Sequence, residues 1–134
     1  MMLKDLNQEL KNHGYDTDFD EEGIYLPEYS IDIIQDSSHY IINPVDDEPV
    51  IANNTNQSLI IINDFAKAKL VGEELAENDY HYNKESARFF SLDNEKIKII
   101  DGRIYLYDNS GETSVFIDIP SMIGALQSKF LGEK

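Results

Sequence analysis

The stretch KIKIIDGRIYLY, residues 96–107, predicts a β-hairpin. Apolar residues alternate with charged and aromatic ones on both sides of Asp101-Gly102, and Asp-Gly is a preferred two-residue loop for a type I′ turn, which requires positive φ at both positions. Asn109–Gly111 supplies a second turn, into a strand over Thr113–Ile117. This part of the chain is therefore expected to form an antiparallel meander.

A second hairpin is expected nearer the amino end. Tyr29–Gln35 and His39–Asn43 are rich in Ile and Tyr, and the residues between them favour a turn. Strand alternation places Asp32 and Ile34 on the face opposite to Ile31 and Ile33. Shorter strands are expected over Gly23–Leu26, Val50–Asn53 and Ala87–Leu92.

The two ends of the chain have the apolar spacing of amphipathic helices. The first helix is expected over Met2–His13, and Gly14 follows it at the position of a C-terminal cap. The last is expected over Pro120–Leu131, with Asp118 as a candidate N-cap.

A middle helix is expected over Ser58–Val71, with Thr55 or Asn56 as a candidate N-cap. The apolar run Leu59–Ile62 favours a strand locally, but the residues after it continue with helical spacing. The segment Glu73–Lys84 lacks clear periodicity, so it is expected to be a loop or a short helix.

These elements predict an α+β fold: an antiparallel sheet of hairpins with an N-terminal, a middle and a C-terminal helix, in one domain over residues 1–134. There is a faint internal echo, because Val50–Asn53 followed by Ser58–Leu70 resembles Val115–Asp118 followed by Ser121–Leu131. Such strand-then-helix segments arise easily in a short chain without duplication.

The composition excludes several classes of protein. The chain has no cysteine, which excludes disulfides and thiolate metal sites and fits a reducing, cytoplasmic location. The amino end lacks the layout of a signal peptide, and no apolar run approaches the roughly 18–20 residues of a membrane span. The net charge of −15 argues against direct contact with nucleic acid or anionic lipid.

No catalytic, cofactor or metal motif emerges, so the chain is not expected to be an enzyme. Asp16, Asp18 and Asp20 alternate as in a calcium loop, but an EF-hand needs Gly at the sixth position and Glu at the twelfth. Those positions hold Glu21 and Pro27. The three histidines lack the spacing of metal ligands, and no nucleophile elbow or phosphate-binding loop is present.

The negative charge is concentrated at one end. Residues 1–50 contain thirteen acidic residues and only two basic ones, Lys4 and Lys11. The expected partner of such a surface is a basic protein, with no direct nucleic acid or membrane contact, and tyrosines would add apolar and cation–π contacts. The candidate partner-binding residues are Asp16, Asp18, Asp20, Glu21, Glu22, Tyr25, Glu28, Tyr29, Asp32, Asp36, Asp46, Asp47 and Glu48.

The spacing of these acids suggests a mimic of nucleic acid. In an extended chain, residues two apart project to one side about 6.6 Å apart, so Asp16, Asp18 and Asp20 would form a row of anions. Glu28, Asp32 and Asp36 would form a looser row along a strand edge. Such rows resemble the phosphates that a DNA-binding protein neutralises; the alternative is a merely solubilising surface.

The segment from Met2 to Asn12, followed by short strands and Ser58–Leu70, resembles small acidic phage anti-CRISPR proteins, specifically the type II-A inhibitors of Cas9. The resemblance covers about half of the chain, and the meander after Lys96 has no counterpart in it. It implies a cytoplasmic inhibitor that acts as a DNA mimic and engages the basic residues that otherwise read the PAM.

Two further families have comparable layouts. The order of a helix, three strands, a helix, more strands and a last helix resembles class I type III secretion chaperones, which implies a dimer that binds an extended effector segment. Bacterial immunity proteins for basic nuclease toxins are a third possibility. All three hypotheses, inhibitor, chaperone and immunity protein, imply that the chain binds a protein, and they differ in which protein it binds.

Overall fold

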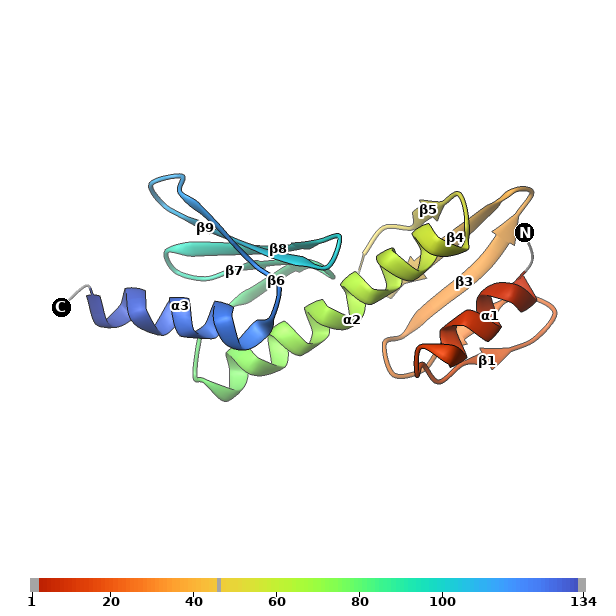
Figure 1. Cartoon of the computed structure of the whole chain (residues 1–134), viewed down its shortest axis with the longest axis horizontal. Coiled ribbons are helices and arrows are strands. Elements are labelled where there is room, and N and C mark those ends of the chain that lie inside the picture. The colour runs from red at the N-terminus through yellow and green to blue at the C-terminus, as the bar shows by residue number, and fades with distance from the viewer. Residues whose placement is uncertain (1–2, 46, 133–134) are drawn as a thin grey trace. The chain divides into compact units, whose positions relative to one another are not determined.

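The computed structural model (Figure 1) describes residues 3–45 and 47–132, without the side chains of residues 129–132. The chain forms two compact units, Met1–Asn63 (unit 1) and Asp64–Lys134 (unit 2). Helix α2 (Thr55–Glu77) contributes to both, because the division falls within it. The single domain expected over residues 1–134 stays a prediction.

Unit 1 begins with α1 (Leu3–Asn12) and continues as a five-stranded antiparallel meander whose spatial order follows the chain. Its strands are β1 (Asp18–Phe19), β2 (Ile24–Leu26), β3 (Ile31–Asp36), β4 (His39–Pro44) and β5 (Val50–Ala52). Alternation works as expected in β3: Ile31 and Ile33 are buried, while Asp32 and Ile34 are exposed. One face of the sheet therefore supplies the core of unit 1.

Helix α1 ends as its sequence predicts. Gly14 has φ of 88°, and the Tyr15 N–H donates to the Leu10 carbonyl over 3.0 Å. This is the hydrogen bond of a Schellman cap, for which glycine is the preferred residue. Leu6 and Leu10 are fully buried. The expected start at Met2 lies outside the described residues.

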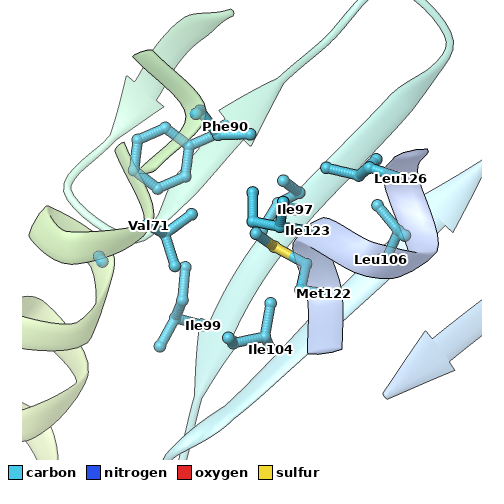
Figure 2. Close-up of a cluster of buried hydrophobic side chains, with 11 residues drawn as sticks. Val71, Phe90, Ile97, Ile99, Ile104, Leu106, Met122, Ile123 and Leu126 are labelled. Atoms are coloured by element: carbon cyan, nitrogen blue, oxygen red, sulfur yellow. The ribbon is translucent and has the colours of Figure 1, made fainter. Parts of the chain in front are cut away.

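Unit 2 repeats this plan after the second half of α2. Its meander is again five-stranded and antiparallel, and α3 (Ile119–Gly132) follows it. The strands are β6 (Asn83–Ser86), β7 (Phe89–Ser91), β8 (Glu95–Ile100), β9 (Arg103–Asp108) and β10 (Thr113–Phe116). Figure 2 shows Val71 of α2, Phe90 of β7 and Met122 of α3 pointing into one cluster with the isoleucines of β8 and β9.

The hairpin between β8 and β9 forms with the expected loop. Asp101 and Gly102 have φ of 52° and 77°, as a type I′ turn requires. The carboxylate of Asp64, which is 2% exposed, accepts hydrogen bonds from the N–H groups of Asp101 and Gly102 at 2.8 and 2.7 Å. Lys67 donates to the Gly102 carbonyl at 2.6 Å. Helix α2 thus holds this turn by two side chains one helical turn apart.

The middle helix differs from its prediction at both ends. Leu59–Ile62 is helical, so the strand alternative is wrong. The N-cap is Asn54, whose side chain accepts from the Gln57 N–H at 2.8 Å, and not Thr55 or Asn56. The helix continues to Glu77, so the loop or short helix expected over Glu73–Lys84 is instead the last turn of α2, a turn, and the start of β6.

The two units correspond element by element. Each has a helical segment, a five-stranded meander and a helix, and from β3 onward equivalent residues lie 64 positions apart (33 to 97). The strand registers agree: the pairs Ile33–Ile42 and Tyr40–Ala52 correspond to Ile97–Leu106 and Ile104–Phe116. The N-caps agree as well, since Asp118 accepts from the Ser121 N–H at 2.8 Å. The internal echo therefore extends through both units, but its predicted alignment is wrong by one residue: Val115 is equivalent to Ile51 and Asp118 to Asn54, not to Val50 and Asn53.

The predicted α+β class, with antiparallel hairpins and helices at the start, middle and end of the chain, is confirmed. Among the described residues, the longest helix is α2, and none of α1, α2 and α3 combines the length and the apolar character needed to traverse a bilayer.

Candidate functional site

The outward side of the sheet in unit 1 carries an acidic row in register across three strands. Asp18 of β1 pairs with Tyr25 of β2, and Tyr25 pairs with Asp32 of β3. Directly paired residues share a face, and neighbouring strands lie about 4.8 Å apart, so Asp18 and Asp32 are separated by about 10 Å across the sheet. Asp36 lies on the same face, four residues along β3 from Asp32. We call Asp18, Tyr25, Asp32 and Asp36 the acidic face.

The acidic face is accessible and has no cation of its own. Its three aspartates are exposed, and the Tyr25 side chain is 37% exposed. The strands β1 to β5 contain no lysine or arginine. The two lysines of unit 1 lie on α1. The negative potential of this face is therefore not offset within the sheet.

The turn between β1 and β2 uses one of the predicted acids for its own structure. The Asp20 carboxylate accepts hydrogen bonds from the N–H groups of Glu22 and Gly23 at 2.8 and 3.1 Å. Because β1 has only two residues, Asp18 is the one member of the expected row Asp16, Asp18 and Asp20 that lies on a strand. Glu21 and Glu22 are exposed on the turn.

The second expected row is also shorter than predicted. Asp32 and Asp36 both lie on β3, which is an internal strand between β2 and β4 and not a sheet edge. Glu28 lies in the loop before β3. Tyr29, in the same loop, packs edge-to-face on Tyr15 with ring centroids 5.9 Å apart, so it contributes to local packing.

The loop between β4 and β5 holds the remaining predicted acids. Asp47 is half-buried, and its carboxylate accepts from the Glu48 N–H at 2.8 Å. Glu48 is exposed, and Asp46 lies outside the described residues. The structure thus brings Asp18, Tyr25, Asp32 and Asp36 onto one face and places the other candidates in loops.

An apolar row that the sequence analysis did not assign to the site borders these acids. Ile34 pairs with Ile41, and Ile41 pairs with Ile51, across β3, β4 and β5. Ile34 is 39% exposed and Ile51 is 60% exposed. The alternation of β3 had placed Ile34 beside Asp32, but only the register of the next two strands shows that it belongs to a continuous row. Exposed apolar residues in a row indicate a contact surface.

The described residues contain no cluster of three or more His, Asp or Glu side chains suited to holding a metal ion. The only buried carboxylate among them is Asp64, which is occupied by the turn amides of Asp101 and Gly102. It stabilises the hairpin, so it is a structural residue. The acidic face offers charge and one aromatic ring for contact, and the isoleucine row beside it offers aliphatic side chains.

Comparison of the chain with protein-family models, with curated protein sequences and with solved structures found no match.

Proposed function

We propose that this chain is a non-enzymatic inhibitor that binds a basic, nucleic-acid-handling protein through the acidic face of unit 1. The supporting observation is the register Asp18–Tyr25–Asp32, which holds two carboxylates and a tyrosine on one rigid side of the sheet. Anions fixed on strands cost less conformational entropy on binding than anions in a flexible tail. The face would occupy a groove that otherwise neutralises phosphates, and so act as a DNA mimic.

The charge of unit 1 supports the same proposal. Its residues include 13 acidic and 2 basic side chains, a net charge of −11, whereas unit 2 has 13 acidic and 9 basic side chains, a net charge of −4. Such a field steers a basic partner toward unit 1 and raises the association rate. A Cas9-like nuclease, as in the anti-CRISPR resemblance, and a basic nuclease toxin both offer the required surface.

A second candidate function is favoured by the apolar row. Ile34, Ile41 and Ile51 would suit an extended, apolar segment of a secreted effector, as in the secretion-chaperone resemblance. The two functions differ in their salt dependence. Charge-driven association weakens steeply as salt rises, whereas burial of isoleucine side chains does not.

The test compares two double charge reversals in an assay of nuclease inhibition and binding kinetics. Asp18→Lys with Asp32→Lys should lower the association rate with a Cas9–guide complex or a basic nuclease toxin by about tenfold or more, because the steering charge is inverted. Glu73→Lys with Glu77→Lys changes the net charge equally on an exposed part of α2. This control should retain most of the association rate.

Thermal unfolding of both variants checks that the fold is intact, since exposed substitutions change stability by only about 0.5 kcal/mol. Normal binding by the Asp18/Asp32 variant would place the binding surface elsewhere. Binding that persists unchanged at about 1 M salt, where the Debye length is about 3 Å, would favour the chaperone-like function.

A further inference from the structure

The outward side of strands β8 and β9 in unit 2 has the opposite charge, and Glu85, which accepts from the Ser91 hydroxyl at 2.9 Å, lies at the border of this area. Along β8 and β9 the buried residues are Ile97, Ile99, Ile104 and Leu106, so the alternate positions point outward. Those outward positions hold two lysines, an arginine, two tyrosines and an isoleucine, and no acidic residue. We call Lys96, Lys98, Arg103, Tyr105 and Tyr107 the basic face.

Three side chains of the basic face make aromatic or cation–π contacts. The Lys98 ammonium lies 5.1 Å from the centroid of the Phe89 ring and 6.0 Å from that of Tyr107. The rings of Tyr105 and Tyr107 are stacked, with centroids 6.4 Å apart and an interplanar angle of 17°. Lysine and tyrosine are thus presented together on a half-exposed surface, the combination that binds carboxylates and apolar side chains.

Both faces lie on the outward side of their sheets in the repeated fold, and they share one equivalent position. Asp32 in unit 1 is equivalent to Lys96 in unit 2 (32 to 96). The apolar row of unit 1 also has a counterpart: Ile34–Ile41–Ile51 corresponds to Lys98–Tyr105–Val115, paired in the same register. One repeat therefore presents anions beside isoleucines, and the other presents cations beside aromatic rings.

We propose that the basic face of one molecule binds the acidic face of a second copy of this chain. Charge complementarity identifies the occupant: carboxylates on a five-stranded antiparallel sheet oppose Lys96, Lys98 and Arg103, and the isoleucine row covers Tyr105 and Val115, which is 51% exposed. Net charge does not choose between a nucleic acid and a second copy, because the −15 of the chain repels both; the second copy is favoured by its isoleucine row, which a nucleic acid lacks.

The contact joins two different surfaces, so it is heterologous and produces head-to-tail chains or rings. It also occupies the acidic face that the proposed function assigns to a basic partner, and to that extent it rests on that function. The basic face would then act as a competitor, which holds the acidic face of a neighbouring molecule until a more strongly basic protein displaces it.

Sedimentation velocity of the full chain tests the proposal over a range of concentrations. Self-association is expected at low salt of about 0.15 M, where the Debye length of about 8 Å screens the repulsion between the two net charges of −15 more than the close contacts between the faces, and should be lost at about 1 M salt. Lys96→Glu with Lys98→Glu, and separately Asp18→Lys with Asp32→Lys, should each weaken it by about tenfold or more, because like charges then face each other. A wild-type chain that stays monomeric at low salt would overturn the proposal.

Mixing the two variants provides the decisive measurement. The Lys96→Glu/Lys98→Glu variant keeps its acidic face, and the Asp18→Lys/Asp32→Lys variant keeps its basic face. These two intact faces can bind each other, so the equimolar mixture should associate although neither variant does so alone. A mixture that remains monomeric, or association that survives in both separate variants, contradicts the proposal. Lys4→Glu with Lys11→Glu on α1 is the matched control and should associate like the wild type.

Two further experiments distinguish self-association from the proposed function and from nucleic-acid binding. The Lys96→Glu/Lys98→Glu variant keeps the acidic face, so it should still bind a basic partner protein even though it no longer self-associates. Loss of self-association with this binding retained tests the further inference alone, whereas loss of partner binding with Asp18 and Asp32 intact would count against the proposed function. Anisotropy of a labelled oligo-dT should show no binding by the basic face. Oligonucleotide binding that Lys96→Glu with Lys98→Glu abolishes would assign this face to nucleic acid instead.

Discussion

Gly23 closes the turn between β1 and β2 at a point where β3 leaves no room for a side chain. A Cβ atom at this position would lie 2.4 Å from the Ile33 carbonyl oxygen, which belongs to the backbone and cannot rotate away. Gly23→Ala should therefore lower the free energy of unfolding by about 1–3 kcal/mol, the usual cost of forcing extra atoms into a packed site. Urea denaturation followed by far-UV circular dichroism measures the change.

The matched control is Gly124→Ala in α3. A Cβ at Gly124 meets no atom within 4 Å, and the residue is exposed on the helix. Alanine has the higher helix propensity, so this variant should be more stable than the wild type by up to about 1 kcal/mol. Equal effects at the two glycines would show that the close approach of β3 to Gly23 is not what constrains the turn.

For the acidic residues near Gly23, the sequence predicts exposure but not hydrogen bonding. Composition and alternation correctly place most candidate acids at exposed positions. They do not reveal that the Asp20 carboxylate accepts hydrogen bonds from the N–H groups of Glu22 and Gly23, because those bonds depend on how the chain turns. The same turn sets the pairing of Asp18 with Tyr25, and the loop between β2 and β3 sets the pairing of Tyr25 with Asp32.

At the scale of elements, the two equivalent N-caps offer a test of pH dependence. Asp118 caps α3 and Asn54 caps α2 with the same 2.8 Å hydrogen bond from the backbone. Hydrogen bonds from the side chain and backbone of Ser121 lower the pKa of Asp118 below its usual value, with a smaller contribution from Lys67. A carboxyl with a lowered pKa in the folded state stabilises it above the unfolded-state pKa, and this stabilisation is lost as pH falls through the lowered pKa.

Asp118→Ala should accordingly lower Tm at pH 7, and the difference from the wild type should shrink as the pH is lowered below about 4. Asn54→Ala removes a cap that does not titrate, so its effect on Tm should be the same across that range. Differential scanning calorimetry measures both. A constant difference for Asp118→Ala would show that the cap acts as a neutral acceptor.

Turn and capping residues predicted where several helices and strands begin and end, whereas the end of α2 depends on packing. The Asp101-Gly102 loop, the cap at Gly14 and the cap at Asp118 were each identified from residues adjacent in sequence. The end of α2 was not, because Glu73–Lys84 lacks clear helical periodicity. Gly72 is buried within α2, where a Cβ would lie 3.5 Å from Phe90, and the helix stops only where Asp79 takes φ of 62°.

At the scale of the molecule, the two units have the same architecture but different residues at equivalent positions, which explains why the sequence shows only a faint echo. Equivalent positions keep their burial but not their residue type: Tyr40 corresponds to Ile104, and Ser58 to Met122, all of them buried. Outward positions differ in charge, as Asp32 and Lys96 do. A meander tolerates this divergence because its register depends on turns and on the alternation of burial, so two units of one architecture present opposite surfaces.

Each unit has a buried core of its own, which gives the last prediction. Ile33 and Ile97 are fully buried at equivalent positions, so replacing either by alanine should cost about 2–5 kcal/mol locally. Hydrogen exchange followed by mass spectrometry should show that Ile33→Ala lowers protection in β2, β3 and β4 while β7, β8 and β9 keep theirs, and that Ile97→Ala does the reverse. Because α2 contributes to both units, its amides before and after Asn63 should respond to different variants. Equal loss of protection in both units from either substitution would instead show one cooperative domain, as the chain length alone suggests.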